Sequence, residues 1–369
     1  MRFDNVIVGG GLSGGMIAQE YREQGGQESV LIVARESHPP YHRPPLTKDF
    51  LRGDTPAFDT FLHPVAWWEE HNVDLRTSTE VARLDPGAHT ITLADGETIE
   101  FGRVALATGS TPRTLPGTVS IRTLDDSQAV AELLERGHGK LGVIGGGFIG
   151  VEAGASARMK GFEVTMAVPE NVVWEHLFGA DVAIYFQRQL ESHGIQVHTG
   201  QKELPEDDYD LVLAGIGVTP NVGLAEAAGL EVSNGVLVDE HLSAADGVWA
   251  VGDIANYQSV VHGRRLRVEH WDVALNQGAY VGRVWAGKED GPYSVVPYFF
   301  SDIGDWTWFE YVGPGTGSAE VRGSMDDDDF VAYYTDDSGA VTACLGVNRS
   351  DEVNAAKELI TNHTGAPAA

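Results

Sequence analysis

The sequence contains two glycine-rich segments of one pattern, VIVGGGLSG and GVIGGGFIG, each lying between an apolar strand and a predicted helix. In G-x-G-x-x-G register, the glycines are Gly9, Gly11 and Gly14 in the first segment and Gly145, Gly147 and Gly150 in the second. Such glycines allow a tight turn and let the backbone approach a pyrophosphate at the positive end of a helix. One such segment is weak evidence, but two in one chain predict two bound dinucleotides with electrons passing between them.

The chain has 369 residues, which is enough for two or three domains with cores of their own. Its only cysteine is Cys344, so the sequence has no disulfide framework and no C-x-x-C pair. This excludes flavoenzymes that work through a redox dithiol. It also argues against a peroxide-reducing cysteine, because Cys344 lies far from both glycine segments in the sequence. No metal site is predicted.

The composition bears on partners and location. A net charge of −29 repels nucleic acid and anionic membranes at long range, and no apolar run reaches the length of a membrane span. The first strand begins at Phe3, which leaves no room for a signal peptide, so we expect a cytoplasmic protein. A local basic cluster of Arg264, Arg265 and Arg267 either docks an acidic redox protein or forms a solvated hairpin.

The order of elements predicts an α/β fold. It consists of two Rossmann-like, doubly wound nucleotide-binding domains, one inserted in the other, with a C-terminal α+β domain. The first βαβ unit is expected at 3–9, 12–24 and 29–34, followed by a proline-rich loop at 37–53, an antiparallel excursion at 74–102 and a strand at 103–113. A second βαβ unit begins at Lys140, further strands lie at 209–221 and 247–251, and a final helix follows near the C-terminus.

The strand at 247–251 is expected to return to the sheet begun by residues 3–9, because the second βαβ unit interrupts the first. This order sets the predicted domain boundaries. The FAD-binding domain is assigned to 1–115 and 236–296, the NAD-binding domain to 116–235, and the C-terminal domain to 297–369.

Several motifs now make the assignment more specific. PYHRPPLTK, the ATG turn at 107–109, GIGVTPN, VWAVGDIA and RVEHWDVALNQG occur in the order found in one flavoprotein family. The chain resembles the oxygenase-coupled ferredoxin, putidaredoxin and rubredoxin reductases, whose animal relative is apoptosis-inducing factor. The resemblance covers essentially the whole chain. It implies FAD in the first domain and NADH or NADPH in the second.

The resemblance also implies roles for individual residues around the FAD. Asp253, after Gly252 in the VGDIA segment, would bond the ribityl or phosphate side of the flavin, and Arg43 and Lys48 match positions that hold FAD. Thr108 and Gly109 form the matching ATG turn.

Lys48 also pairs, in such relatives, with the glutamate that corresponds to Glu152. A carboxylate buried in a βαβ unit is costly unless it is paired, and Lys48 supplies the partner. Beside the flavin, the pair would orient the nicotinamide and stabilise the negative charge that develops on reduction. The competing interpretation is a structural ion pair.

RVEHWDVA matches the segment that lies along the flavin ring, so Glu269, His270 and Trp271 are candidates for the flavin wall. Trp271 is placed to influence the exit of electrons, whereas His270 is given no role in proton transfer. Phe300 stands where many relatives carry tryptophan. It is either an aromatic lid or a core residue.

The acids that usually bind the ribose hydroxyls stand at unusual positions. For FAD the usual position is Arg35, so Glu36 takes over or the adenosine end is held differently. For the nicotinamide cofactor the strand ends in MAVPE, which makes Glu170 the candidate. No nearby Arg or Lys holds a 2′-phosphate, so NADH is preferred over NADPH. The segment 196–215 is shorter than expected for the family, which indicates that a small β-meander is missing.

The sequence therefore predicts a flavoprotein that oxidises NADH and passes electrons through FAD to a small iron–sulfur protein. The main alternative is a redox-sensing protein that resembles apoptosis-inducing factor, with slow turnover and a change of oligomeric state as its output. The sequence also leaves open that such a reductase forms a homodimer. A third alternative, a flavin monooxygenase or oxidase, has no recognisable substrate-pocket signature.

Overall fold

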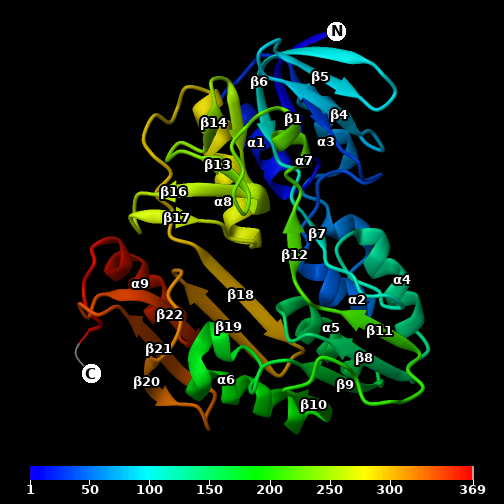
Figure 1. Ribbon diagram of the computed structural model, residues 1–369, viewed down its shortest axis with the longest axis vertical. Coiled ribbons are helices and arrows are strands. Elements are labelled where there is room, and N and C mark those ends of the chain that lie inside the picture. The colour runs from blue at the N-terminus through cyan, green and yellow to red at the C-terminus, as the bar shows by residue number, and fades with distance from the viewer. Residues whose placement is uncertain (368–369) are drawn as a thin grey trace. The chain divides into compact units, whose positions relative to one another are not determined.

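The computed structural model describes residues 1–367, and the chain divides into two compact units. The first unit comprises Met1–His42, Phe58–Thr111 and Thr219–Val295; the second comprises Arg43–Ala57, Pro112–Val218 and the chain from Val296 onward. Each unit contains one glycine loop on an α/β sheet whose central strands are parallel, and the second also contains an antiparallel C-terminal sheet (Figure 1). The predicted fold class is confirmed.

The first unit is built on a sheet with the strand order β14-β15-β6-β1-β2-β3. The strands of this unit are β1 (Arg2–Val8), β2 (Val30–Val33), β3 (Val73–Arg76), β4 (Val81–Asp85), β5 (Thr90–Leu93), β6 (Thr98–Leu106), β13 (Val236–Val238), β14 (Ser243–Ala245), β15 (Val248–Ala250), β16 (Ala255–Ser259) and β17 (Arg264–Leu266). Of these, β13, β16 and β17 form a separate sheet. The helices of the unit are α1 (Leu12–Glu23), α3 (Val65–Glu70), α7 (Gly223–Ala227), the 3₁₀ turn η3 (Gly252–Ile254) and α8 (Trp271–Trp285).

The central strands of the main sheet are parallel and deeply buried. β1 pairs in parallel with both β2 and β6, and the last four residues of β1, Asn5–Val8, are at most 5% exposed. Such apolar runs are typical of parallel strands that are covered on both faces. β15 pairs in parallel with β6, so the segment at 247–251 does return to the sheet begun by β1, as predicted.

The second unit contains a four-stranded parallel sheet of order β10-β9-β8-β11 and a five-stranded antiparallel sheet of order β18-β19-β22-β21-β20. Its strands are β8 (Lys140–Ile144), β9 (Glu163–Val168), β10 (Ile195–Thr199), β11 (Leu211–Ala214), β18 (Tyr298–Ile303), β19 (Thr307–Val312), β20 (Ala319–Ser324), β21 (Asp329–Thr335) and β22 (Val341–Val347). Its helices are η1 (Pro44–Thr47), α2 (Asp49–Arg52), α4 (Leu124–Leu134), α5 (Phe148–Met159), α6 (Glu175–Ser192) and α9 (Ser350–Thr361). Three short elements span positions where the chain passes from one unit to the other: η2 (Ala57–Thr60), β7 (Ser110–Pro112) and β12 (Val218–Pro220).

The βαβ unit β8-α5-β9 forms where the sequence predicts it. α9 packs against β22 and β19 of the C-terminal sheet, which gives that segment the predicted mixture of antiparallel strands and a final helix. The predicted domain boundaries stay a prediction, and the last two residues of the C-terminal domain, 368–369, lie outside the described residues.

Two details of the predicted excursion at 74–102 are wrong. β3 is not part of it, because Val73–Arg76 pairs in parallel with β2 and extends the main sheet. The segments predicted as separate strands around residue 102 form one continuous strand, β6, whose first half pairs with β5 and whose second half pairs with β1 and β15. Strand pairing over long sequence separations decides both points, and residue patterns carry little information about such pairing.

The short segment between β10 and β11 contains no strand or helix within residues 200–210. The second sheet is therefore a minimal one of four strands. None of the described helices is both long and apolar enough to cross a membrane.

Candidate functional site

The first glycine loop forms a cradle at the N-terminus of α1. Gly11 caps this helix without any side-chain hydrogen bond, so the backbone N–H groups of the first turn remain available to a ligand. A Cβ atom on Gly9 would lie 2.2 Å from the carbonyl oxygen of Ala107, and one on Gly14 would lie 2.1 Å from that of Gly9. A Cβ atom on Gly11 would meet nothing within 4 Å. The outer two glycines are thus required by packing, whereas the middle one faces open space that suits a pyrophosphate.

The ATG turn closes the cradle from the end of β6. The hydroxyl of Thr108 donates to the carbonyl oxygen of Asn221 at 2.8 Å, and the Asn221 side-chain amide donates to the carbonyl oxygen of Thr108 at 2.9 Å. The Asn221 backbone N–H also donates to the carbonyl oxygen of Gly109. Asn221 therefore holds this turn in place. The GIGVTPN motif that contains Asn221 gives no sign of this role in the sequence.

Asp253 follows β15 at the carboxyl end of the same sheet, where doubly wound folds bind their ligands. It is 8% exposed, and its carboxylate accepts a 2.6 Å hydrogen bond from the hydroxyl of Ser110. The preceding residue, Gly252, has φ +74° and donates its N–H to Oε1 of Gln277 at 2.7 Å. Gln277 is fully buried, and its Nε2 has no hydrogen-bond partner within the described residues. An orphaned donor beside the glycine–aspartate turn fits a polar group of a bound FAD.

The flavin-wall candidates lie at the start of α8. His270 caps this helix by accepting the N–H of Asp272 at Nδ1, at 3.4 Å, which supports a structural role for His270. The indole N–H of Trp271 donates to Nδ1 of His42 at 2.9 Å. The side chain of Glu269 pairs with Arg267.

The acidic candidate for the adenosine end of FAD is already engaged. Glu36 accepts a hydrogen bond from the hydroxyl of Tyr41 and is half-buried, whereas the neighbouring Arg35 is exposed.

Arg265 and Arg267, of the basic cluster, donate to backbone carbonyl oxygens within the first unit, on and around the β16–β17 hairpin. That arrangement favours the solvated hairpin over a docking surface.

The second glycine loop resembles the first, except that a Cβ atom on its middle glycine, Gly147, would lie 3.0 Å from the carbonyl oxygen of Gly215. Gly147 caps α5 without a side-chain hydrogen bond. A Cβ atom on Gly145 would lie 2.4 Å from the carbonyl oxygen of Gly215, and one on Gly150 would lie 3.0 Å from that of Gly145. The geometry therefore suits a second dinucleotide.

Glu170 stands two residues beyond the end of β9, next to this loop. Its Oε1 lies 2.6 Å from Nδ1 of His176, and its Oε2 is buried without a hydrogen-bond partner in the part of the chain that the structure describes. A buried carboxylate oxygen without a donor is costly, and a ribose hydroxyl is a donor that would satisfy it. Glu170 is thus suited to bind the ribose of a nicotinamide dinucleotide.

Lys48 and Glu152 form the predicted ion pair in the second unit, each 7% exposed, with Lys48 Nζ 3.3 Å from Glu152 Oε1. The hydroxyls of Thr47 and Ser301 also donate to the Glu152 carboxylate, at 2.5 and 2.6 Å. Each oxygen of this carboxylate therefore accepts a hydroxyl, which offsets its burial.

A second carboxylate, which the sequence analysis missed, completes the network. Asp302 Oδ2 lies 3.0 Å from Lys48 Nζ, and the Phe300 ring lies 4.9 Å from the same nitrogen. Burial alone would lower the pKa of Lys48, but the two carboxylates outweigh it, so the pKa lies above its ordinary value of 10.5. Lys48 is therefore a fixed cation at neutral pH. The contact with Phe300 favours a place for this ring in the site over a purely core role.

The other candidates are placed as follows. The guanidinium of Arg43 donates to the carbonyl oxygen of Arg122 in the second unit.

Cys344 is buried in β22, and this burial raises the pKa of its thiol to about 12, so it is not a reactive thiolate. Among the described residues, no group of three or more His, Cys, Asp or Glu side chains is arranged to hold a metal ion.

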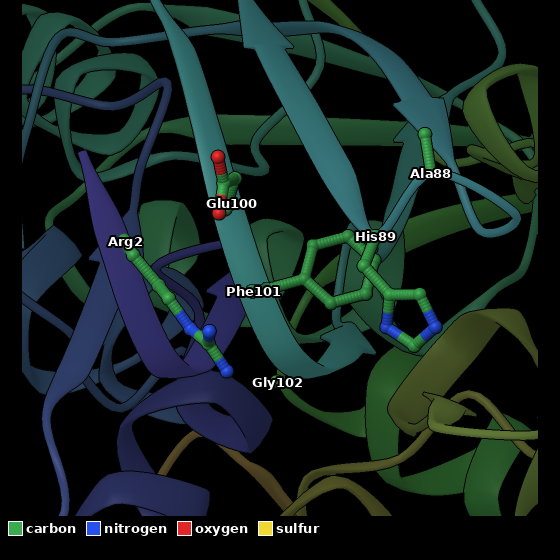
Figure 2. Close-up of a pocket in the computed structure, with 6 residues that line it drawn as sticks. All are labelled: Arg2, Ala88, His89, Glu100, Phe101 and Gly102. Carbon is green, nitrogen blue, oxygen red and sulfur yellow. The ribbon is translucent and has the colours of Figure 1, made fainter.

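A hollow of about 350 Å³ lies in the first unit (Figure 2). It is lined by Arg2, Ala88, His89, Glu100, Phe101 and Gly102. Arg2 is the first residue of β1, whereas the glycine loop follows the last residue of that strand. Since doubly wound sheets bind ligands at the carboxyl ends of their strands, we give this hollow no part in the site.

Comparison with known proteins identifies the family. The sequence profile of the pyridine nucleotide-disulphide oxidoreductases matches residues 3–278. The chain belongs to this family. A similar protein is the ferredoxin–NAD(+) reductase component of the anthranilate 1,2-dioxygenase system of Burkholderia cepacia, which is 33% identical over 96% of this chain and 93% of its own length. Putidaredoxin reductase of Pseudomonas putida is 32% identical over 97% of this chain and 92% of its own length.

Solved structures give the same result. The reductase in the covalent putidaredoxin reductase–putidaredoxin complex matches 98% of this chain and 93% of its own, with a TM-score of 0.90 and 30% identity. A ferredoxin reductase from Rhodopseudomonas palustris matches 98% and 96%, with a TM-score of 0.91 and 29% identity. This member of the family has a single cysteine and thus no redox disulfide within the chain.

The Lys48 network yields a prediction about stability. Replacing Lys48 by Met leaves the buried Glu152 carboxylate without its cation, and we expect the free energy of unfolding to fall by about 3 kcal/mol. Urea unfolding of the purified protein measures this change.

The matched control is Asp302→Asn, which removes the more exposed carboxylate and keeps the Lys48–Glu152 pair. This variant should lose less than about 1 kcal/mol. Equal losses in the two variants would contradict the assignment of Glu152 as the main partner of Lys48.

Proposed function

We propose that this protein is an FAD-dependent oxidoreductase that takes electrons from NADH and passes them to a small ferredoxin- or rubredoxin-like protein. The observation that carries the proposal is the pair of similar loops, each with a helix N-terminus free of side-chain caps, in a chain that matches ferredoxin reductases over nearly its whole length. The relatives named above are reductases that serve ferredoxin-type proteins, which favours this function over a redox sensor like apoptosis-inducing factor.

The residues of the first unit bind FAD in this proposal. The N-terminus of α1 and Gly11 hold the pyrophosphate, and Asp253, oriented by Ser110, accepts a hydrogen bond from a hydroxyl on the ribityl side. Bound FAD would supply the conversion of a two-electron donor into single-electron steps. Trp271 contributes to the wall beside the flavin ring.

The residues of the second unit bind NADH. The N-terminus of α5 holds its pyrophosphate, Glu170 binds the ribose, and Lys48 and Glu152 orient the nicotinamide. Lys48 acts electrostatically and not as a proton donor, because its raised pKa keeps it charged across the physiological range. Phe300, over the Lys48 ammonium, limits the access of water to this part of the site.

The chain contributes no sulfur chemistry of its own, since Cys344 is buried in the C-terminal sheet. The acceptor therefore takes electrons directly from the flavin edge, which an iron–sulfur protein can do. We further propose a cytoplasmic location and a homodimer. Light scattering on the purified protein tests the homodimer.

The first experiment follows electrons through the FAD-loaded protein under anaerobic conditions. NADH should bleach the visible flavin band rapidly, and adding a ferredoxin should restore the band while the ferredoxin is reduced. No bleaching with either NADH or NADPH would contradict the enzyme function. Slow bleaching together with a shift in oligomeric state would favour the sensor.

The second prediction concerns the choice of nucleotide. Replacing Glu170 by Gln removes a charged acceptor for the ribose, so kcat/KM for NADH should fall by about tenfold, which corresponds to roughly 1.4 kcal/mol. The same change removes the repulsion of a 2′-phosphate, so the preference for NADH over NADPH should also narrow.

Glu163→Gln is the matched control, because it removes one exposed charge at the opposite end of the same strand. It should leave both kcat/KM for NADH and the preference for NADH over NADPH unchanged. An unchanged nucleotide preference in Glu170→Gln would remove this residue from the site.

A further inference from the structure

Trp271 is bonded to a histidine that is far away in the sequence. Its indole N–H lies 2.9 Å from Nδ1 of His42, and the two ring centroids are 5.8 Å apart at an angle of 48°. An indole nitrogen can only donate a hydrogen bond, so Nδ1 of His42 must be the acceptor. His42 is therefore neutral in this arrangement and carries its proton on Nε2.

The surroundings of His42 favour this neutral form. Its backbone N–H donates to the carbonyl oxygen of Thr60 at 2.8 Å, which fixes the position of the residue. Burial lowers the pKa of His42 below its ordinary value of 6.5. Burial also lowers the pKa of the neighbouring His63, and a positive charge on His42 lowers it further.

The hydrogen bond is not explained by the need to satisfy a buried donor. The indole N–H groups of Trp68, Trp174 and Trp285 are buried and have no partner within the described residues. Trp271 is only half-buried, so water could have satisfied its N–H. The imidazole of His42 nevertheless accepts this N–H. The arrangement therefore favours a role in orienting the indole ring over a role in satisfying a buried donor.

The packing around Trp271 includes apolar contacts. The ring lies beside an apolar cluster of Leu12 and Met16 from α1 and Ala279 from α8. Apolar contacts of this kind are non-directional, whereas the hydrogen bond to His42 fixes the edge of the indole.

We propose that His42 is a positioning residue that holds the indole plane of Trp271 at the aromatic wall through which electrons leave the flavin. The role in electron transfer rests on the proposed function, whereas the hydrogen bond can be tested independently. Protonation of His42 removes the acceptor, so the orientation of Trp271 changes when the pH falls below the pKa of His42.

The test uses the FAD-loaded protein labelled with ¹⁵N-tryptophan. Trp271→Phe identifies the indole signal of Trp271 in a ¹H–¹⁵N spectrum. This signal should titrate with a midpoint below pH 6.5, and the titration should disappear in His42→Phe, with the spectrum otherwise preserved. His42→Gln, whose side-chain carbonyl can accept the indole N–H, should restore a wild-type-like shift without the titration. A Trp271 signal that is unchanged in His42→Phe would overturn the proposal.

A kinetic measurement separates positioning from simple structural support. In His42→Phe, bleaching of the flavin by NADH should keep its wild-type rate, whereas electron transfer to a ferredoxin should slow severalfold and recover in His42→Gln. His89→Phe is the control, because His89 contacts Phe101 and lies at the opposite edge of the sheet from the loops; both rates should stay unchanged. Equal rates of electron exit in wild type and His42→Phe would remove His42 from the reaction. If the wild-type protein itself passes no electrons, the proposed function fails, while the indole signal still decides whether His42 holds Trp271.

Discussion

The structure depends on a close backbone contact that is made once in each unit. At both glycine loops, the residue after the first strand packs against the backbone carbonyl of a residue that follows a neighbouring parallel strand, Ala107 in one case and Gly215 in the other. A side chain on Gly9 or Gly145 would collide with that carbonyl, and both residues have positive φ angles. This contact brings the N-terminus of a helix to the carboxyl edge of the sheet, where its free N–H groups can hold a phosphate. One constraint on the backbone, used twice, therefore produces two similar nucleotide cradles.

The second unit adds a charged network to its cradle. Glu152 comes from the first turns of α5, Thr47 and Lys48 from the segment around η1, and Ser301 and Asp302 from β18. Burying a carboxylate against one lysine is at best neutral for stability, because desolvation offsets the attraction of the charges. The two hydroxyl donors hold the Glu152 carboxylate in place, and the second carboxylate, that of Asp302, helps to keep Lys48 charged. Lys48 is therefore a cation that stays protonated and is held in place, which suits the electrostatic role proposed for it.

The sequence predicted those parts of the site that depend on local pattern. The glycine loops, the βαβ units, Asp253 at its strand end and the Lys48–Glu152 pair all have local motifs, and the pair needed the family resemblance as well. The parts that were missed depend on contacts between distant segments. Asn221, Thr47, Ser301, Asp302 and His42 each gain their position from a partner elsewhere in the chain. The assignment of 73–76 to an excursion was wrong for the same reason, since only the pairing with β2 places that segment in the main sheet.

The central claim is that the first loop holds FAD and the second holds NADH, and Gly11 offers the most direct test. A methyl group there meets no protein atom within 4 Å, so Gly11→Ala should change the unfolding free energy of the FAD-free protein by less than about 1 kcal/mol. The measurement is the affinity of this variant for FAD and, separately, for NADH. The account predicts a clear loss of FAD affinity with NADH affinity retained. Unchanged FAD binding, or a selective loss of NADH binding, would contradict it.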